Sequence, residues 1–194
     1  MAVDIDGAEY DKMVCLSLDI LRDYGISAFP LDILTLAEHM GIKTIPYSSL
    51  AAQTYAELIS KPGTEKGFTI AGKCDNGKVT YTVYYNDVDM TRQACRFTLA
   101  HEIKHIANND FLKKELTEAD EQLAEYFAKC LLAPQAIIIA ERLSTPDDYV
   151  SHFDISVTAA SIWFGAVEKR KYRFGELHLF DPEKEYLEEI GYGW

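Results

Sequence analysis

Apolar residues recur every three or four positions in two segments near the start of the chain. This spacing predicts one helix from Glu9 to Tyr24, ended by Gly25, and a second from Pro30 to Met40, ended by Gly41. A first strand is expected directly afterwards, over residues 42–45. The chain therefore begins with helices and then changes to a strand pattern.

The next part of the chain carries β-branched and aromatic residues in two short runs. Residues 68–72 and 79–85 have the composition of strands, and Asn76-Gly77 between them is a strong signal for a tight hairpin turn. We therefore expect two antiparallel strands joined by this turn.

Helical spacing returns after the hairpin. One helix is predicted from about residue 90 to Asn108. Another is predicted from Thr117, whose hydroxyl can cap a helix N-terminus, to Leu132.

The last third of the chain is less regular. Two or three helices are predicted over residues 135–170, with Ser156 as the N-cap of one of them, and a strand over residues 173–180. The acidic end, residues 183–194, fits neither pattern. The simplest interpretation is a single α+β domain over residues 1–194, in which residues 135–170 form a C-terminal helical part.

The composition is that of a globular protein, and we expect it in the cytoplasm. Of the 194 residues, 48% are hydrophobic and 26% are charged, which is enough for one sizeable core. The four cysteines are far apart, with no Cys-x-x-Cys pair, and are expected to be reduced. The N-terminus lacks a basic region followed by an apolar stretch, and no apolar run approaches the length of a membrane span.

The charge balance disfavours direct binding to nucleic acid. Nineteen Lys and Arg against 31 Asp and Glu give a net charge of −12, which repels a phosphate backbone. The most basic stretch, residues 168–173, is interpreted as a solvated helix end. A DNA-binding regulator is therefore a disfavoured interpretation of this chain.

One pentapeptide on the predicted helix that ends at Asn108 carries candidate chemistry. His101 and His105 are four residues apart, so on a helix both imidazoles lie on one face and can bind one metal ion. Glu102 lies beside that face, where it can activate an attacking water by taking its proton. Imidazole ligands and this chemistry favour zinc, with one ion per chain. The alternative is a surface helix with two solvated histidines, but the apolar residues 97–100 indicate a buried helix.

A catalytic zinc site needs a third protein ligand. The helix predicted next offers four acidic residues, which are Glu118, Asp120, Glu121 and Glu125. Glu121 is the predicted ligand because it lies at the rim of the helix face that carries the apolar residues. Glu118 and Glu125 are interpreted as charged residues on a solvated helix surface.

Two stretches of the sequence resemble the ImmA/IrrE family of metallopeptidases. Residues 96–105 are similar to the family's Arg-Phe-Thr-x-Ala-His-Glu-x-x-His helix, and residues 121–134 to its Glu-x-x-Ala-x-x-Phe-Ala-x-x-Leu-Leu-x-Pro helix. In the family the glutamate that opens the second pattern is the third zinc ligand, and it corresponds to Glu121. Segments within residues 25–42 and at residues 153–157 also resemble the family.

The resemblance implies a fold and an activity. The fold would be zincin-like, with a small antiparallel or mixed sheet packed on the motif helix and additional helices. The activity would be zinc-dependent endopeptidase cleavage of a cytoplasmic regulatory protein, typically a helix-turn-helix DNA-binding repressor or an antitoxin, often encoded by a prophage or another mobile element. Neither a membrane nor nucleic acid is an expected partner.

The alternative is a regulatory binding module with a zincin fold and vestigial or no proteolytic activity. The intact Glu102 argues against this alternative, because a purely structural metal site has no use for a base beside its ligands. The sequence does not distinguish residues that stabilise a transition state, and the candidates are His152, His178, Tyr84 and Tyr126.

Two further expectations follow from the resemblance. Lys104 stands where family members usually have glycine, so its side chain is expected either to extend toward solvent or to alter the rim of the site. The strand over residues 81–86, directly before the motif helix, is expected at the edge of the cleft, where a peptide can bind by strand addition.

Overall fold

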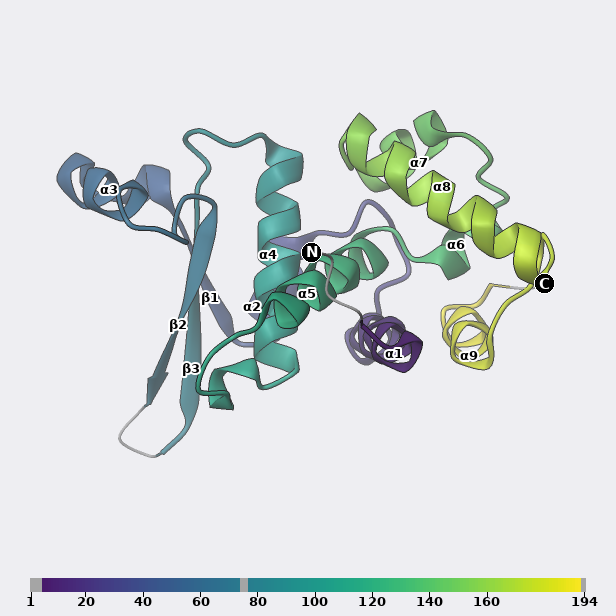
Figure 1. Cartoon of the computed structure of the whole chain (residues 1–194), viewed down its shortest axis with the longest axis horizontal. Coiled ribbons are helices and arrows are strands. Elements are labelled where there is room, and N and C mark those ends of the chain that lie inside the picture. The colour runs from purple at the N-terminus through teal and green to yellow at the C-terminus, as the bar shows by residue number, and fades with distance from the viewer. Residues whose placement is uncertain (1–4, 74–76, 193–194) are drawn as a thin grey trace. The chain divides into compact units, whose positions relative to one another are not determined.

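The structure, a computed structural model, describes residues 5–73 and 77–192 (Figure 1). The chain divides into two compact units. Asp32–Asp120 form the first, which we call the sheet unit, and Met1–Leu31 with Glu121–Trp194 form the second, which we call the helical unit. The fold class is α+β, as predicted, and the single domain over the whole chain stays a prediction.

The sheet unit contains a three-stranded mixed sheet. Its strands are β1 (Ile42–Pro46), β2 (Gly67–Lys73) and β3 (Val79–Tyr85), in the order β1-β3-β2. β3 pairs parallel with β1 and antiparallel with β2. The predicted first strand and the two hairpin strands are therefore confirmed. Asn76 of the expected turn lies outside the described residues.

The place of β3 in this sheet corrects one expectation. The strand over residues 81–86 is expected at a cleft edge, but β3 pairs on both of its sides and is the central strand. The edge strand that precedes it in the hairpin is β2. The sequence does not reveal this order, because β1 joins β3 across more than 30 intervening residues.

The sheet unit also contains short helices. They are α2 (Ile33–His39), the 3₁₀ turns at Tyr47–Ser49 and Asp110–Leu112, and α3 (Ala52–Ile59). α2 begins three residues later than predicted because Asp32 caps it, accepting hydrogen bonds from the backbone N–H groups of Leu34 and Thr35. The sequence does not predict α3, because it is only two turns long and none of its residues is buried.

α4 (Arg92–Ala107) is the helix that carries the histidine pair, and it agrees with the prediction. The Thr91 hydroxyl caps its N-terminus by accepting a hydrogen bond from the Ala94 N–H. Its apolar residues Leu99, Ala100 and Ile103 are buried. The helix runs alongside the sheet and packs against β2, β3 and α2 (Figure 1).

The described part of the helical unit consists of helices and their connections. They are α1 (Gly7–Asp23), most of α5 (Glu118–Leu132), α6 (Gln135–Ala140), α7 (Pro146–Phe153), α8 (Val157–Phe174) and α9 (Asp181–Glu189). Ser156 caps α8, as predicted, by accepting a hydrogen bond from the Ala159 N–H. Fully buried residues of its core include Leu21, Phe127 and Leu131.

The strand predicted over residues 173–180 is wrong. α8 continues to Phe174, and Gly175, with a φ of 104°, ends it. Arg170 on α8 forms hydrogen bonds of 2.6 and 2.5 Å with Glu183 on α9 and one of 3.0 Å with the backbone oxygen of His178. These contacts fold the connection back on itself, and the acidic end that follows forms α9.

Two other expectations concern membranes and cysteines. Within the described ranges, no helix is long and apolar enough to cross a membrane. Cys15, Cys95 and Cys130 are free thiols, as expected, and Cys74 lies outside the described residues.

Candidate metal centre

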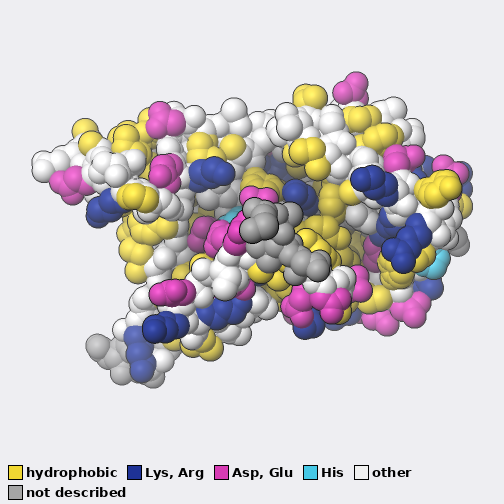
Figure 2. All heavy atoms as spheres, viewed as in Figure 1, with side chains coloured by type: hydrophobic (Ala, Val, Ile, Leu, Met, Phe, Trp, Pro, Cys, Tyr) yellow, Lys and Arg dark blue, Asp and Glu magenta, His cyan; other side chains and the backbone are white. Residues whose placement is uncertain are grey.

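Three residues that the sequence predicts as metal ligands come together in the structure. One ligand atom from each of His101, His105 and Glu121 lies within 4.8 Å of the other two, and we call these residues the ligand group. The Nε2 atoms of the two histidines are 3.2 Å apart. His105 is buried, His101 is half-buried and Glu121 is exposed. Because His101 is half-buried and Glu121 is exposed, the group is reachable from solvent. Figure 2 shows a small area of histidine surface beside acidic side chains on this face of the molecule.

The first turn of α5 places Glu121. The Asp120 side chain accepts hydrogen bonds from the Thr117 N–H at 2.9 Å and from its hydroxyl at 2.7 Å, and the Asp120 N–H donates to that hydroxyl at 3.2 Å. This reciprocal arrangement is the N-cap predicted at Thr117. Because Glu121 follows Asp120 directly in the same helix, the turn that holds Asp120 also sets the position of the Glu121 backbone.

Asp110 fixes the orientation of the His105 ring. Its buried carboxylate oxygen Oδ2 lies 2.8 Å from His105 Nδ1. Burial alone would raise the pKa of Asp110, but four hydrogen bonds lower it to about 2; the donors are Lys104, Lys113, His105 and Asn108. An ionised carboxylate only accepts hydrogen bonds, so the imidazole proton is on Nδ1 and the Nε2 lone pair faces the ligand group.

This donor set fits a zinc ion. Zinc binds imidazole nitrogen and carboxylate oxygen at about 2.0–2.2 Å in a tetrahedron, which places two ligand atoms roughly 3.3–3.6 Å apart. The 3.2 Å between the two Nε2 atoms is close to that spacing. The exposed carboxylate of Glu121 can turn toward the pair. If all three residues bound the ion, one tetrahedral position would stay open, as catalytic zinc sites require.

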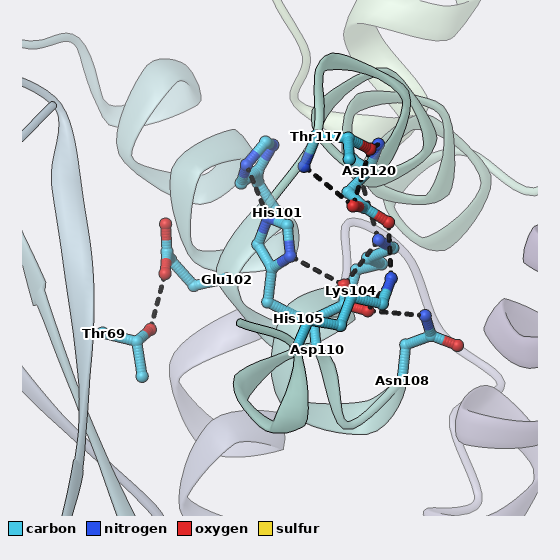
Figure 3. A network of polar contacts seen from close by, with 10 residues as sticks. Thr69, His101, Glu102, Lys104, His105, Asn108, Asp110, Thr117 and Asp120 are labelled. Atoms are coloured by element: carbon cyan, nitrogen blue, oxygen red, sulfur yellow. Dashed lines mark hydrogen bonds and ion pairs between the residues drawn. The ribbon is translucent and has the colours of Figure 1, made fainter. Parts of the chain in front are cut away.

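Glu102 extends from α4 toward the sheet, where Thr69 holds it. Its Oε2 accepts a hydrogen bond of 2.5 Å from Thr69 Oγ1 on β2 (Figure 3). Gly67 and Thr69 share one face of β2, and Thr98 and Glu102 are one turn apart on α4. A Cβ on Gly67 would lie 2.8 Å from Thr98 Cγ2. The absence of that Cβ lets β2 approach α4 closely, so that the Thr69 hydroxyl reaches Glu102.

The sequence analysis does not identify Thr69 as a functional residue. The sequence shows only that Thr69 lies in a strand of the hairpin. The alternation of side chains along a strand predicts which face of the sheet Thr69 lies on, but not which helix residue it contacts. The contact becomes visible only when the packing of β2 on α4 is known.

Replacing Thr69 by valine is expected to lower kcat about tenfold and to leave zinc binding unchanged. The hydroxyl orients the Glu102 carboxylate, and a hydrogen bond to a charged group contributes about 1.5–3 kcal/mol. Cleavage of a quenched fluorogenic peptide library and the zinc content measure the two effects. Thr69→Ser keeps the hydroxyl and should retain activity; a fully active Thr69→Val would show that this contact has no part in catalysis.

Lys104 contradicts both expectations for its side chain. It is fully buried, so it neither extends toward solvent nor belongs to an exposed rim. Its Nζ donates hydrogen bonds to Asp110 Oδ2 at 2.6 Å and to the backbone oxygen of Asp120 at 3.1 Å (Figure 3). These partners lie 6 and 16 residues further along the chain, so the helical pattern around the motif does not predict them.

The four candidates for stabilising a transition state have contacts of other kinds. Tyr84 stacks on Phe68, Tyr126 packs edge-on against Trp163, His152 Nδ1 lies 3.3 Å from Glu141 Oε2, and His178 stacks on Phe174. These contacts do not distinguish one of the four. Glu118 and Glu125 are exposed on α5, as expected.

A helix-borne His-Glu-x-x-His sequence with a carboxylate from the next helix, in an α+β chain, defines the metallopeptidase class. The chain matches the family model of the M78 peptidases, the IrrE N-terminal-like domain, over residues 37–162. This match covers more than half of the chain, so the chain belongs to the M78 peptidase family, as the resemblance to ImmA/IrrE sequences implies. A search of curated proteins finds no match.

Proposed function

We propose that the chain is a zinc-dependent endopeptidase with a zincin-like arrangement of the sheet on α4. His101, His105 and Glu121 bind the metal, and Glu102 is the general base. The observation that carries this proposal is the convergence of the three ligand atoms within 4.8 Å. Because the family match runs through Asp120, where the two units meet in sequence, we propose that both units form one peptidase domain.

The protein residues around the ligand group have distinct roles in the proposed reaction. Zinc, when bound, supplies a Lewis acid that lowers the pKa of water toward about 7 and polarises a carbonyl. Glu102 accepts the proton of the attacking water on a carboxylate oxygen and passes it to the leaving amine. Thr69 orients that carboxylate, and Asp110 keeps the His105 proton on Nδ1.

The edge strand β2 supports a binding mode for an extended peptide. Within the described sheet, β2 pairs only with β3, so its other side can accept a further strand. Thr69 on this strand contacts Glu102. A peptide that pairs with β2 would therefore pass beside the general base.

We propose that the substrate is a cytoplasmic regulatory protein, either a helix-turn-helix repressor or an antitoxin encoded with the chain on a prophage or another mobile element. The family resemblance supports this class. The charge supports it as well, because a body with a net charge of −12 attracts the basic surfaces of DNA-binding proteins. The acidic chain itself would act in the cytoplasm and would bind neither nucleic acid nor membrane directly.

The test of this function uses zinc-loaded protein and a helix-turn-helix repressor encoded beside its gene. We expect the repressor to be cut at one site, the cut to stop when a zinc chelator is added, and activity to return with added zinc. Gel electrophoresis and mass spectrometry measure the products. If the repressor binds but stays intact in every zinc-loaded preparation, the chain is the binding module.

The same experiment tests the charge argument when salt is varied. The Debye length falls from ~10 Å at 0.1 M salt to ~3 Å at 1 M, so the second-order rate at low substrate should fall as salt rises. The turnover rate at saturation should change little. A second-order rate that does not change with salt would show that charge has no part in the choice of partner. Cleavage of library peptides without cleavage of the repressor would refute only the proposed substrate class.

A further inference from the structure

A buried charged network connects α4 to the first turn of α5 (Figure 3). Its charged members are Lys104, Asp110, Lys113 and Asp120. The side chains of Lys104 and Asp110 have no exposed surface. Burial of an ammonium and a carboxylate is costly unless each has partners, and here each has several.

One contact of Lys104 bears on His105. The ammonium donates to Asp110 Oδ2 at 2.6 Å, and the same oxygen lies 2.8 Å from His105 Nδ1. Lys104 and His105 therefore contact the same atom, Asp110 Oδ2, and this atom orients the His105 ring. Removing the ammonium would take away one of the two donors to this oxygen, so the carboxylate would be held less firmly beside His105.

The other contact of Lys104 bears on Glu121. The Asp120 carbonyl, which accepts from the ammonium at 3.1 Å, belongs to the peptide group that joins Asp120 to Glu121. Lys104 lies on α4 between the two histidines. The ammonium therefore holds the backbone directly before the third proposed ligand to the helix that carries the other two.

We propose that Lys104 is a positioning residue that pre-organises the ligand group for metal. The proposal rests on the proposed zinc site and adds a role for a residue outside the ligand set. Without the ammonium, fewer contacts would hold the turn before Glu121 and the Asp110 carboxylate, so more of their ordering would have to take place on metal binding, which lowers affinity. ImmA/IrrE sequences usually have glycine at this position. The positioning of the ligand group by a lysine is therefore a feature of this chain and not of the general family pattern.

Lys113 provides a matched control on the same network. Its ammonium lies 2.8 Å from Asp110 Oδ1 and 2.5 Å from Asp120 Oδ1, and its side chain is 40% exposed. Lys113 shares the Asp110 carboxylate with Lys104, but it contacts Oδ1, whereas Lys104 and His105 contact Oδ2. It also has no hydrogen bond to the carbonyl before Glu121 among the bonds described.

The first measurement is the zinc dissociation constant of the full chain, obtained by competition with a chromophoric chelator. We expect Lys104→Met to weaken zinc binding by about 10–100-fold, the usual effect of losing a partner of a metal ligand. We expect Lys113→Met to weaken it less than Lys104→Met does, because the partly exposed Lys113 ammonium contacts neither the Asp110 oxygen beside His105 nor the carbonyl before Glu121.

A double-mutant cycle separates positioning from a general loss of stability. If Lys104 acts largely by holding Glu121, the effect of Lys104→Met on zinc affinity should fall to a few-fold when Glu121 is already alanine. The melting temperature of each metal-free variant is measured in parallel. If Lys104→Met does not fold, Lys104→Gln, which keeps a neutral hydrogen-bond donor, takes its place in the cycle.

The outcomes are distinct for the two proposals. No loss of affinity in Lys104→Met, or a loss no larger than that in Lys113→Met, would overturn the role of Lys104 and leave the ligand set intact. An equal loss with and without Glu121 would overturn the positioning of Glu121 and assign the effect to the contact with Asp110 beside His105. Unchanged affinity in Glu121→Ala alone would remove the proposed ligand set, and the role of Lys104 with it. A loss confined to the background that retains Glu121 supports the positioning role.

Discussion

Glutamine in place of Glu102 is expected to abolish cleavage while the fold and zinc binding persist. An amide has nearly the shape of a carboxylate but cannot accept the proton of the attacking water. General bases contribute about 10²–10⁴-fold to rate, so we expect kcat to fall by at least about 10³-fold. Initial rates on the quenched peptide library and on the candidate repressor measure this loss.

The control for Glu102→Gln is the same change at Glu125. Glu125 is exposed on α5 and lies outside the ligand group, so Glu125→Gln should cleave at the wild-type rate. The zinc content and the melting temperature of both variants should match those of the wild type. Wild-type cleavage by Glu102→Gln would exclude the proposed base, and a loss of zinc in this variant would mean that Glu102 is itself a ligand.

The parts of the site that could be predicted from the sequence are those that helical geometry determines. His101 and His105 meet because four residues make about one turn, and no knowledge of the tertiary fold is needed for this. Glu121 could be selected because the apolar residues of α5 define its inward face. The cap at Thr117 follows in the same way from local hydrogen bonds.

The parts that could not be predicted depend on packing between distant segments. Thr69 reaches Glu102 across 33 residues, and only the close approach of β2 at Gly67 brings them together. The sequence predicts that Lys104 is exposed, because a lysine on a helix usually is. It is buried because Asp110 and Asp120 supply its partners from beyond the end of α4.

The two errors in secondary structure have different physical origins. Residues 173–180 contain apolar and aromatic residues typical of a strand, but the Arg170–Glu183 ion pair joins α8 to α9 and turns the connection between them. The error about β3 concerns its position in the order of the strands; the strand itself is predicted correctly. Pairing order depends on which segments meet in the folded chain, and hairpin signals give only the nearest neighbour.

Removing any one residue of the ligand group should abolish stable zinc binding. We expect the wild-type chain to bind one zinc, and His101→Ala, His105→Ala and Glu121→Ala each to weaken binding by more than about 100-fold. A structural site with four ligands contributes about 10–16 kcal/mol, which is roughly 2.5–4 kcal/mol for each ligand. Atomic absorption after gel filtration and chelator competition measure the stoichiometry and the affinity.

The neighbouring acidic residues of α5 make this experiment decisive for the third ligand. Glu118 and Glu125 are exposed on the same helix, one turn to either side of Glu121, so all three substitutions remove one surface carboxylate at similar cost to the helix. If general electrostatic attraction held the metal, Glu118→Ala and Glu125→Ala would weaken zinc binding as much as Glu121→Ala does. Direct coordination instead predicts a loss at Glu121 alone, because among the described residues of α5 it is Glu121 that groups with the two histidines within 4.8 Å. A loss at Glu118 or Glu125 with full occupancy in Glu121→Ala would assign the third ligand to that residue.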